Sequence, residues 1–264
     1  MSWLLASWRG ILFRIFGLLL LLFLFDGPFF LADLLVPVAK PETVLGWIGL
    51  GHATYPPGFD PTRPWHLAQL AALGILLGGS MLALWWRPAS KPRLLQYFVA
   101  GMLAIAVTIA LSEPQFATFS LVFGVGAPVL LVALYPGRLR SLVSFLPELP
   151  FSRPLLTLSL LVLIGIGFDI LRQLPRLADA GPDLAIALAV VMAASKRPGW
   201  RPLGIITGLS LCHAGLAAIA LARQPGSWGL FGGSLALAGG LAFIAITLRE
   251  WQTAGAVSQK REWA

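Results

Sequence analysis

The amino-acid sequence predicts an all-α, polytopic integral membrane protein, a bundle in which about eight helices cross the bilayer. Its 264 residues have a mean hydropathy of +0.83, and only 11% of them are charged. Apolar runs of about 20 residues recur along the chain, and such runs are long enough to cross the hydrocarbon core of a membrane as helices. Because no stretch is polar enough to form a soluble domain, we expect residues 1–264 to be a single membrane domain.

The first expected helix covers residues 10–35, and a long loop over residues 36–64 follows it. Within this loop, residues 43–50 are expected to form a short helix that lies on the outer membrane surface, among aromatic residues typical of an interface. The other seven helices are expected at residues 65–86, 94–111, 115–135, 154–173, 183–195, 202–222 and 228–248. In the fourth, two glycines and Pro128 in mid-span predict a kink.

The sixth expected helix is unusually short. The 14 residues from Pro182 to Ser195 rise only about 21 Å as a helix, which is less than the thickness of a hydrocarbon core. Two explanations are open. Either a polar funnel reaches down to Asp183, or the preceding Gly-Pro pair begins a broken span that is covered by protein or water.

The distribution of basic residues predicts the orientation. Three loops are rich in Lys and Arg: 86–93, 136–153 and 195–201. Sorting all charged residues by side gives 14 basic and 3 acidic residues on one side, and 5 basic and 8 acidic residues on the other. Because cytoplasmic loops carry an excess of Lys and Arg, we expect a multi-pass protein of the cytoplasmic (inner) membrane with both termini in the cytoplasm. The same bias explains the net charge of +8, so nucleic acid is not an expected partner.

Two segments repeat the same order of features, which indicates an internal duplication. Residues 9–33 contain a basic start, an apolar run, Phe-Asp and Leu-Ala-Asp, and residues 153–179 repeat this order. The basic turns after the second and sixth helices also read alike, WWRPASKPRLL and ASKRPGWRPLG. Halves of about 1–140 and 150–250 would form a parallel 4+4 repeat. The unequal spacing of the closing aspartates, 7 and 10 residues, weighs against it.

The first candidate site is a group of carboxylates near the outer face. Helical rise places Asp26 about 25 Å from Arg9 and Asp169 about 24 Å from Arg153, so both lie just below the outer interface. Asp183 begins the short sixth helix. Ionisable groups inside a membrane are costly and indicate function, and clustered carboxylates bind cations or relay protons. Interfacial acids at helix ends, solvated or paired with arginine, are the alternative interpretation.

Histidines give two weaker candidates. His52, Asp60 and His66 form a His-x7-Asp-x5-His pattern that suits a divalent metal or an outward-facing hydrolytic site. The spacing is not a known zinc pattern, and histidines in an ordinary interfacial loop are the simpler interpretation. His213 lies about 18 Å from the level of Arg201, near mid-membrane. It either joins the ion site or forms a hydrogen bond to a neighbouring helix.

The motif content favours transport over catalysis. The sequence contains no Walker A loop, HExxH, GxSxG or dinucleotide fingerprint, and its single cysteine excludes a CxxC site. We therefore predict no cofactor and favour a small transporter or permease with an outward-facing carboxylate site. Two alternatives stay open: a non-catalytic subunit of a larger membrane complex, and a membrane enzyme that uses the outer His/Asp site. The lipid bilayer is the expected partner, joined by other membrane subunits in the first alternative.

Overall fold

The structure is a computed structural model, and it describes residues 2–26, 64–112, 118, 120, 122–137, 142, 151–173 and 180–262. Every regular element among these residues is helical, which confirms the predicted all-α class. The elements are α1 (Ser2–Asp26), α4 (Pro64–Trp85), η1 (Pro88–Ser90), α5 (Pro92–Ser112), η3 (Val122–Gly126), α7 (Ala127–Leu134), α9 (Arg153–Gln173), α10 (Gly181–Ala194), α11 (Trp200–Ala220) and α12 (Gly229–Glu262).

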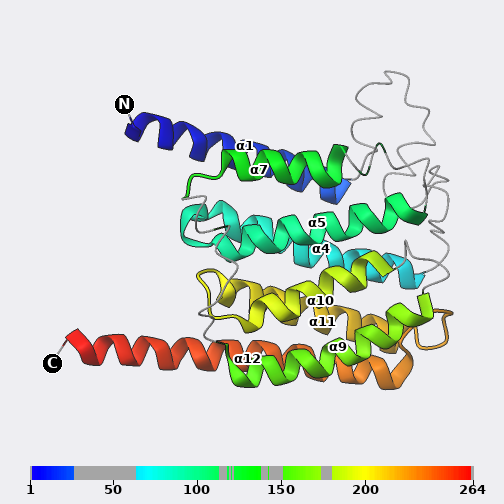
Figure 1. The fold of residues 1–264 in the computed structure, drawn as a ribbon. Helices are drawn as coiled ribbons and strands as arrows, with labels where there is room; N and C mark the ends of the chain where they lie inside the picture. Colours follow the sequence, from blue (N-terminus) through cyan, green and yellow to red (C-terminus); the bar gives the residue numbers. More distant parts are fainter. Residues whose placement is uncertain are drawn as a thin grey trace.

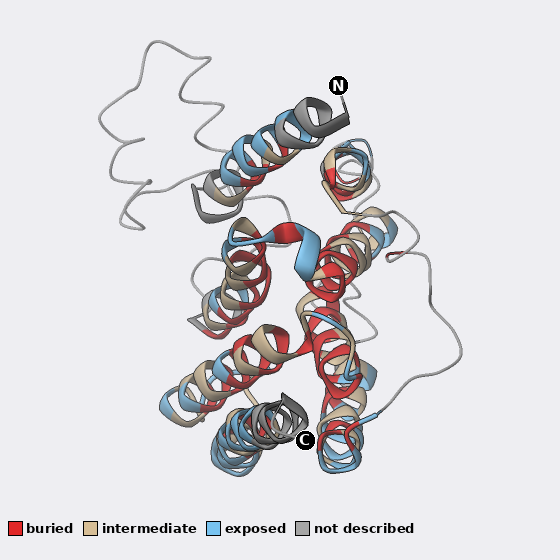
Figure 2. Cartoon of the chain, turned by 90° about the vertical axis from the view of Figure 1, so that its left-hand side faces the viewer, coloured by how far each residue is buried: buried red, intermediate tan, exposed pale blue. Residues whose placement is uncertain are grey.

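The long helices lie side by side in two layers (Figures 1 and 2). One layer contains α1, α4, α11 and α12 in that order, and the other contains α7, α5, α10 and α9. Each helix packs against its neighbours in the layer and against the helix directly across. The core therefore lies between the layers, where large side chains are fully buried: Leu76, Leu94, Leu95, Tyr97, Phe98 and Leu131.

Successive helices run in opposite directions, so the turns gather at two ends of the bundle. We call one of them the basic end; it contains the α4–α5 turn, the α10–α11 turn and the start of α9, and both termini lie there (Figure 1). The other, called the far end here, contains the ends of α1, α9 and α11 and the starts of α4, α10 and α12. Two backbone hydrogen bonds tie the basic end together, from Arg93 to Pro198 (3.2 Å) and from Ser152 to Ala194 (3.0 Å).

Five of the described helices are long and apolar enough to cross a membrane. Their apolar windows are Ala68–Trp85, Pro92–Ser112, Arg153–Leu171, Trp200–Ala220 and Gly229–Gln252. The outward faces of the bundle also expose large apolar side chains, including Ile164, Leu161 and Phe231. Soluble monomers rarely expose contiguous apolar surface of this kind. Length, composition and surface are thus consistent with a multi-pass membrane protein.

Several predicted boundaries are confirmed within two residues, and two are wrong. The predicted sixth helix at 183–195 corresponds to α10 (Gly181–Ala194), which is as short as expected. The first helix starts at Ser2 rather than at 10, and the last continues to Glu262 rather than ending at 248. The physical reason is that hydropathy reports the membrane-embedded length, whereas a helix can continue into water. The predicted loop 36–64 with its interfacial helix lies outside the described residues, except for Pro64, which begins α4.

The predicted fourth helix departs from regular geometry where the kink was expected. Val122–Gly126 form a π-helical turn, and the α-helix α7 follows with Pro128 at its second position. A proline cannot donate a backbone hydrogen bond within a helix, and π-helical turns are one way in which a chain accommodates such a break. Glycine and proline in mid-span therefore mark this irregularity correctly.

Helices α11 and α12 pack with backbone against backbone along a seam of four glycines, Gly208, Gly215, Gly233 and Gly240. A Cβ atom on Gly240 would lie 2.6 Å from the Gly208 carbonyl oxygen, and one on Gly215 would lie 2.7 Å from that of Gly233. The contact repeats every seven residues, as expected for helices that cross at a small angle. Gly229, four residues before Gly233, does not belong to this seam and begins α12 with a positive φ of 68°.

Candidate functional site

Asp169 joins three helices at the far end of the bundle. It lies in the last turns of α9, is 7% exposed, and its Oδ2 accepts a 2.5 Å hydrogen bond from the indole Nε1 of Trp228 at the start of α12. The Trp228 ring in turn packs edge-on against Trp65 of α4, with ring centroids 5.3 Å apart. A carboxylate that accepts a hydrogen bond while buried among apolar rings is held in a fixed position.

The α11–α12 turn positions Trp228. Gly226 and Gly229 flank this residue with φ values of 85° and 68°, which favour glycine. The Ser227 hydroxyl donates to the Ala218 carbonyl (3.2 Å) and accepts from the Gly229 amide (3.2 Å), so the short turn is fixed on both sides. This turn was not singled out from the sequence. Its sequence, Gly-Ser-Trp-Gly, could have predicted a tight turn that holds a tryptophan in place.

Asp183 is fully buried in the first turn of α10. Gly181 brings the start of this helix against α5, because a Cβ atom there would lie 2.6 Å from the Thr108 hydroxyl oxygen. A carboxylate in the first turn of a helix interacts favourably with the free backbone N–H groups and the helix dipole.

The carboxylates of Asp169 and Asp183 lie on helices that pack against each other. The Ser159 hydroxyl of α9 donates to the Val190 carbonyl of α10 (2.9 Å), which fixes the register of the two antiparallel helices. Asp183 precedes Val190 by seven residues on α10, and Asp169 follows Ser159 by ten residues on α9. Counting outward from this hydrogen bond places Asp169 three residues, or about 4.5 Å, nearer the far end than Asp183.

Asp26 lies on a helix that is distant from the helices of Asp169 and Asp183. It is the last residue of α1, and its side chain is outside the described part of the chain. Helix α1 packs against α4 and α7, whereas α9 packs against α10 and α12. The two helices therefore lie at diagonally opposite corners of the two-layer arrangement (Figure 2).

His213 lies near a different helix–helix contact, the one between α4 and α11. It is half-buried in α11, one turn beyond Ser210, whose hydroxyl donates to the Ala72 carbonyl of α4 (2.8 Å). Residues three apart on a helix are neighbours on its surface, so His213 lies beside the α4–α11 contact. Within the described residues, the buried Nε2 atom of His213 has no hydrogen-bond partner.

The histidine metal site stays a prediction. His52 and Asp60 lie outside the described residues, and His66 is described only as a backbone position in the first turn of α4. Among the side chains that the structure describes, no group of three or more His, Cys, Asp or Glu residues is placed to hold a metal ion.

The chemistry available at the far end is therefore that of two buried carboxylates on neighbouring helices, one of them held by an indole N–H. Carboxylates in such surroundings attract cations. Comparisons of the chain with protein-family models, with curated proteins and with solved structures find no match in any of the three.

Proposed function

We propose that this chain is a permease-like protein of the cytoplasmic (inner) membrane, with an outward-facing carboxylate site formed by Asp169 and Asp183. The observation that carries the proposal is the burial of both acids at the far end, on helices that pack against each other. Ionisable groups inside a membrane-embedded helical bundle are rare and mark ion or proton pathways. Two of them at the same end of the bundle support a site that exchanges a cation or a proton with the outside.

We further propose eight crossings that arose by a parallel duplication. The two-layer arrangement supports this, because a twofold axis along the helices would relate α1 to α9, α4 to α10, α5 to α11, and α7 to α12. Each related pair also runs in the same direction (Figure 1), as a parallel repeat requires. The α4–α5 and α10–α11 turns, whose sequences read alike, are related by the same axis.

The orientation is testable by labelling single cysteines with a membrane-impermeant reagent. In a Cys212→Ser background, Gln224→Cys tests the α11–α12 turn at the far end, and Ser258→Cys tests the end of α12. We expect the reagent to label the first variant in intact cells, and the second only after the membrane is permeabilised. Labelling of Ser258→Cys in intact cells would show that the basic end faces outward, and the proposed topology would be wrong.

The carboxylate site is testable in proteoliposomes that contain a pH-sensitive dye. We expect an imposed Na⁺ or K⁺ gradient to drive proton flux through the native protein. Asp169→Asn and Asp183→Asn should each reduce that flux at least about tenfold, because the loss of one carboxylate removes a charge that the cation needs. Glu262→Gln, at the end of α12, is the matched control and should leave the flux unchanged. Unchanged flux in the double Asp→Asn variant would refute the proposal.

A further inference from the structure

The two basic turns with similar sequences lie against each other at the basic end. Figure 1 shows the α4–α5 turn directly beside the α10–α11 turn, and the Arg93 amide donates to the Pro198 carbonyl (3.2 Å). Gly199 has a φ of 97°, and a Cβ atom on it would lie 3.2 Å from the Lys91 Cα. Two segments of like charge are therefore held in direct contact, although charge repulsion opposes that contact.

Arg93 is the most unusual cation in this contact. It is 7% exposed, although guanidinium groups are rarely buried without a carboxylate partner. Its Nε donates to the Met192 carbonyl (3.3 Å), and its Nη1 donates to Oε1 of Gln96 (3.0 Å). Both groups that accept hydrogen bonds from this guanidinium in the described part of the chain are neutral. These two bonds use two of the five N–H groups of the guanidinium.

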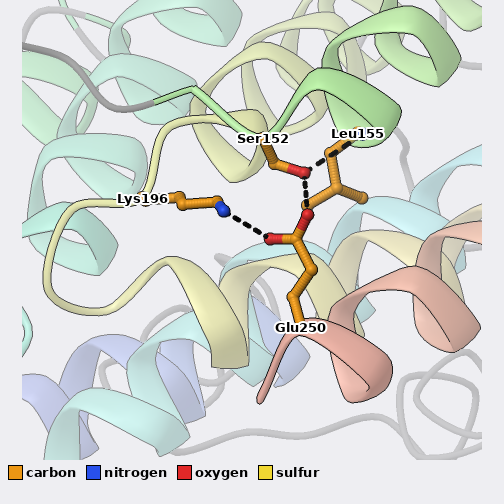
Figure 3. A network of polar contacts seen from close by, with 4 residues as sticks. All are labelled: Ser152, Leu155, Lys196 and Glu250. Atoms are coloured by element: carbon orange, nitrogen blue, oxygen red, sulfur yellow. Dashed lines mark hydrogen bonds and ion pairs between the residues drawn. The ribbon is translucent and has the colours of Figure 1, made fainter. Parts of the chain in front are cut away.

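The charged residues of the two turns around Arg93 are also cations. The positive charge of Arg197 acts on it from the α10–α11 turn. Lys91 donates to the Ala83 carbonyl in the last turn of α4 and to the Trp86 carbonyl just after this helix, at 2.6 Å each. Burial, and then the charge of Arg87, lower the pKa of Lys91. Glu250, a described carboxylate at this end, accepts from the Ser152 hydroxyl and forms an ion pair with Lys196 (Figure 3).

Membrane orientation does not require this arrangement. Loop cations specify topology while they stay exposed to water, so the positive-inside bias gives no reason to bury Arg93. This residue also lies in the first turn of α5, where the helix dipole favours anions over cations. An anion at this position would interact favourably with the guanidinium, with the neighbouring cations and with the start of the helix.

We propose that the two basic turns form a binding site for a phosphate group, with the Arg93 guanidinium as its principal ligand and Arg197 beside it. A guanidinium matches phosphate oxygens through paired N–H groups, and a phosphate carries enough negative charge for more than one cation. The phosphate comes either from the headgroup of an anionic lipid in the adjacent leaflet or from a soluble anion. This site is independent of the carboxylates at the far end.

The test is a set of thermal unfolding measurements on the purified full-length protein, followed by intrinsic tryptophan fluorescence. Inorganic phosphate is titrated in detergent, with sodium chloride at the same ionic strength as reference. In parallel, nanodiscs of phosphatidylglycerol are compared with nanodiscs of phosphatidylcholine. The variants are Arg93→Gln and Arg197→Gln, and Arg153→Gln is the matched control. Arg153 is an exposed cation at the same end of the bundle, at the start of α9.

We expect a phosphate-dependent or a phosphatidylglycerol-dependent rise in Tm for the native protein and for Arg153→Gln. Arg93→Gln should weaken the apparent affinity about tenfold or more, because a charge-assisted hydrogen bond is lost. The Arg197 side chain is only half-buried, so Arg197→Gln is expected to fold. This variant keeps the test valid if Arg93→Gln does not fold. A rise with phosphate identifies a soluble anion, and a rise with phosphatidylglycerol alone identifies a lipid. No rise in either arm, or equal rises in all three variants, would overturn the proposal.

Discussion

Replacement of Gly215 by alanine is expected to lower the free energy of unfolding by about 3 kcal/mol, since overpacking a tight contact forces the backbone apart. The added Cβ atom would lie 2.5 Å from the Leu237 amide nitrogen and 2.7 Å from the Gly233 carbonyl oxygen. Both atoms belong to the α12 backbone, which cannot move aside as a flexible side chain can. Equilibrium unfolding in mixed detergent micelles measures the effect.

The same substitution at Gly165 is the matched control. Gly165 lies in α9, and a Cβ atom there would meet nothing within 4 Å. Alanine forms helix more readily than glycine by up to about 1 kcal/mol, so Gly165→Ala should be neutral or slightly stabilising. Equal destabilisation by the two variants would contradict the glycine seam as the reason that α11 and α12 pack closely.

Replacement of Glu250 by alanine is expected to lower the free energy of unfolding by about 2 kcal/mol, because this residue of α12 connects the start of α9 with the α10–α11 turn. One carboxylate oxygen accepts from the Ser152 hydroxyl, and the other lies 3.3 Å from the Lys196 ammonium (Figure 3). The same Ser152 hydroxyl accepts from the Leu155 amide and caps the start of α9. The loss of Glu250 therefore weakens α9, α12 and the α10–α11 turn together, which thermal unfolding in detergent would detect.

Lys196→Ala separates the two contacts of Glu250. The lysine side chain is 40% exposed, and ion pairs with exposed partners contribute about 1 kcal/mol or less. We therefore expect this variant to lose less than half as much stability as Glu250→Ala. A larger loss in Lys196→Ala would mean that the ion pair, rather than the hydrogen bond to the helix cap, holds the basic end together.

The sequence by itself determined the class of the protein and the approximate position of its helices. The hydropathy of an apolar span reflects the free energy of its transfer from water to hydrocarbon. This free energy depends on the composition of the span and hardly on the rest of the chain. For this reason even the short α10 was placed within two residues of its observed bounds, Gly181–Ala194. Gly124 and Gly126, shortly before Pro128, likewise predicted an irregularity where the π-helical turn lies.

Only the tertiary structure decided which polar residues meet. Helical rise predicted similar depths for Asp26 and Asp169, but depth does not reveal which helices are neighbours. The structure packs α9 against α10 and leaves α1 at the opposite corner, and it buries Arg93 between two turns that are about a hundred residues apart. Helix pairing depends on complementary side chains and close glycine contacts between distant segments, and these terms cannot be read from any single span.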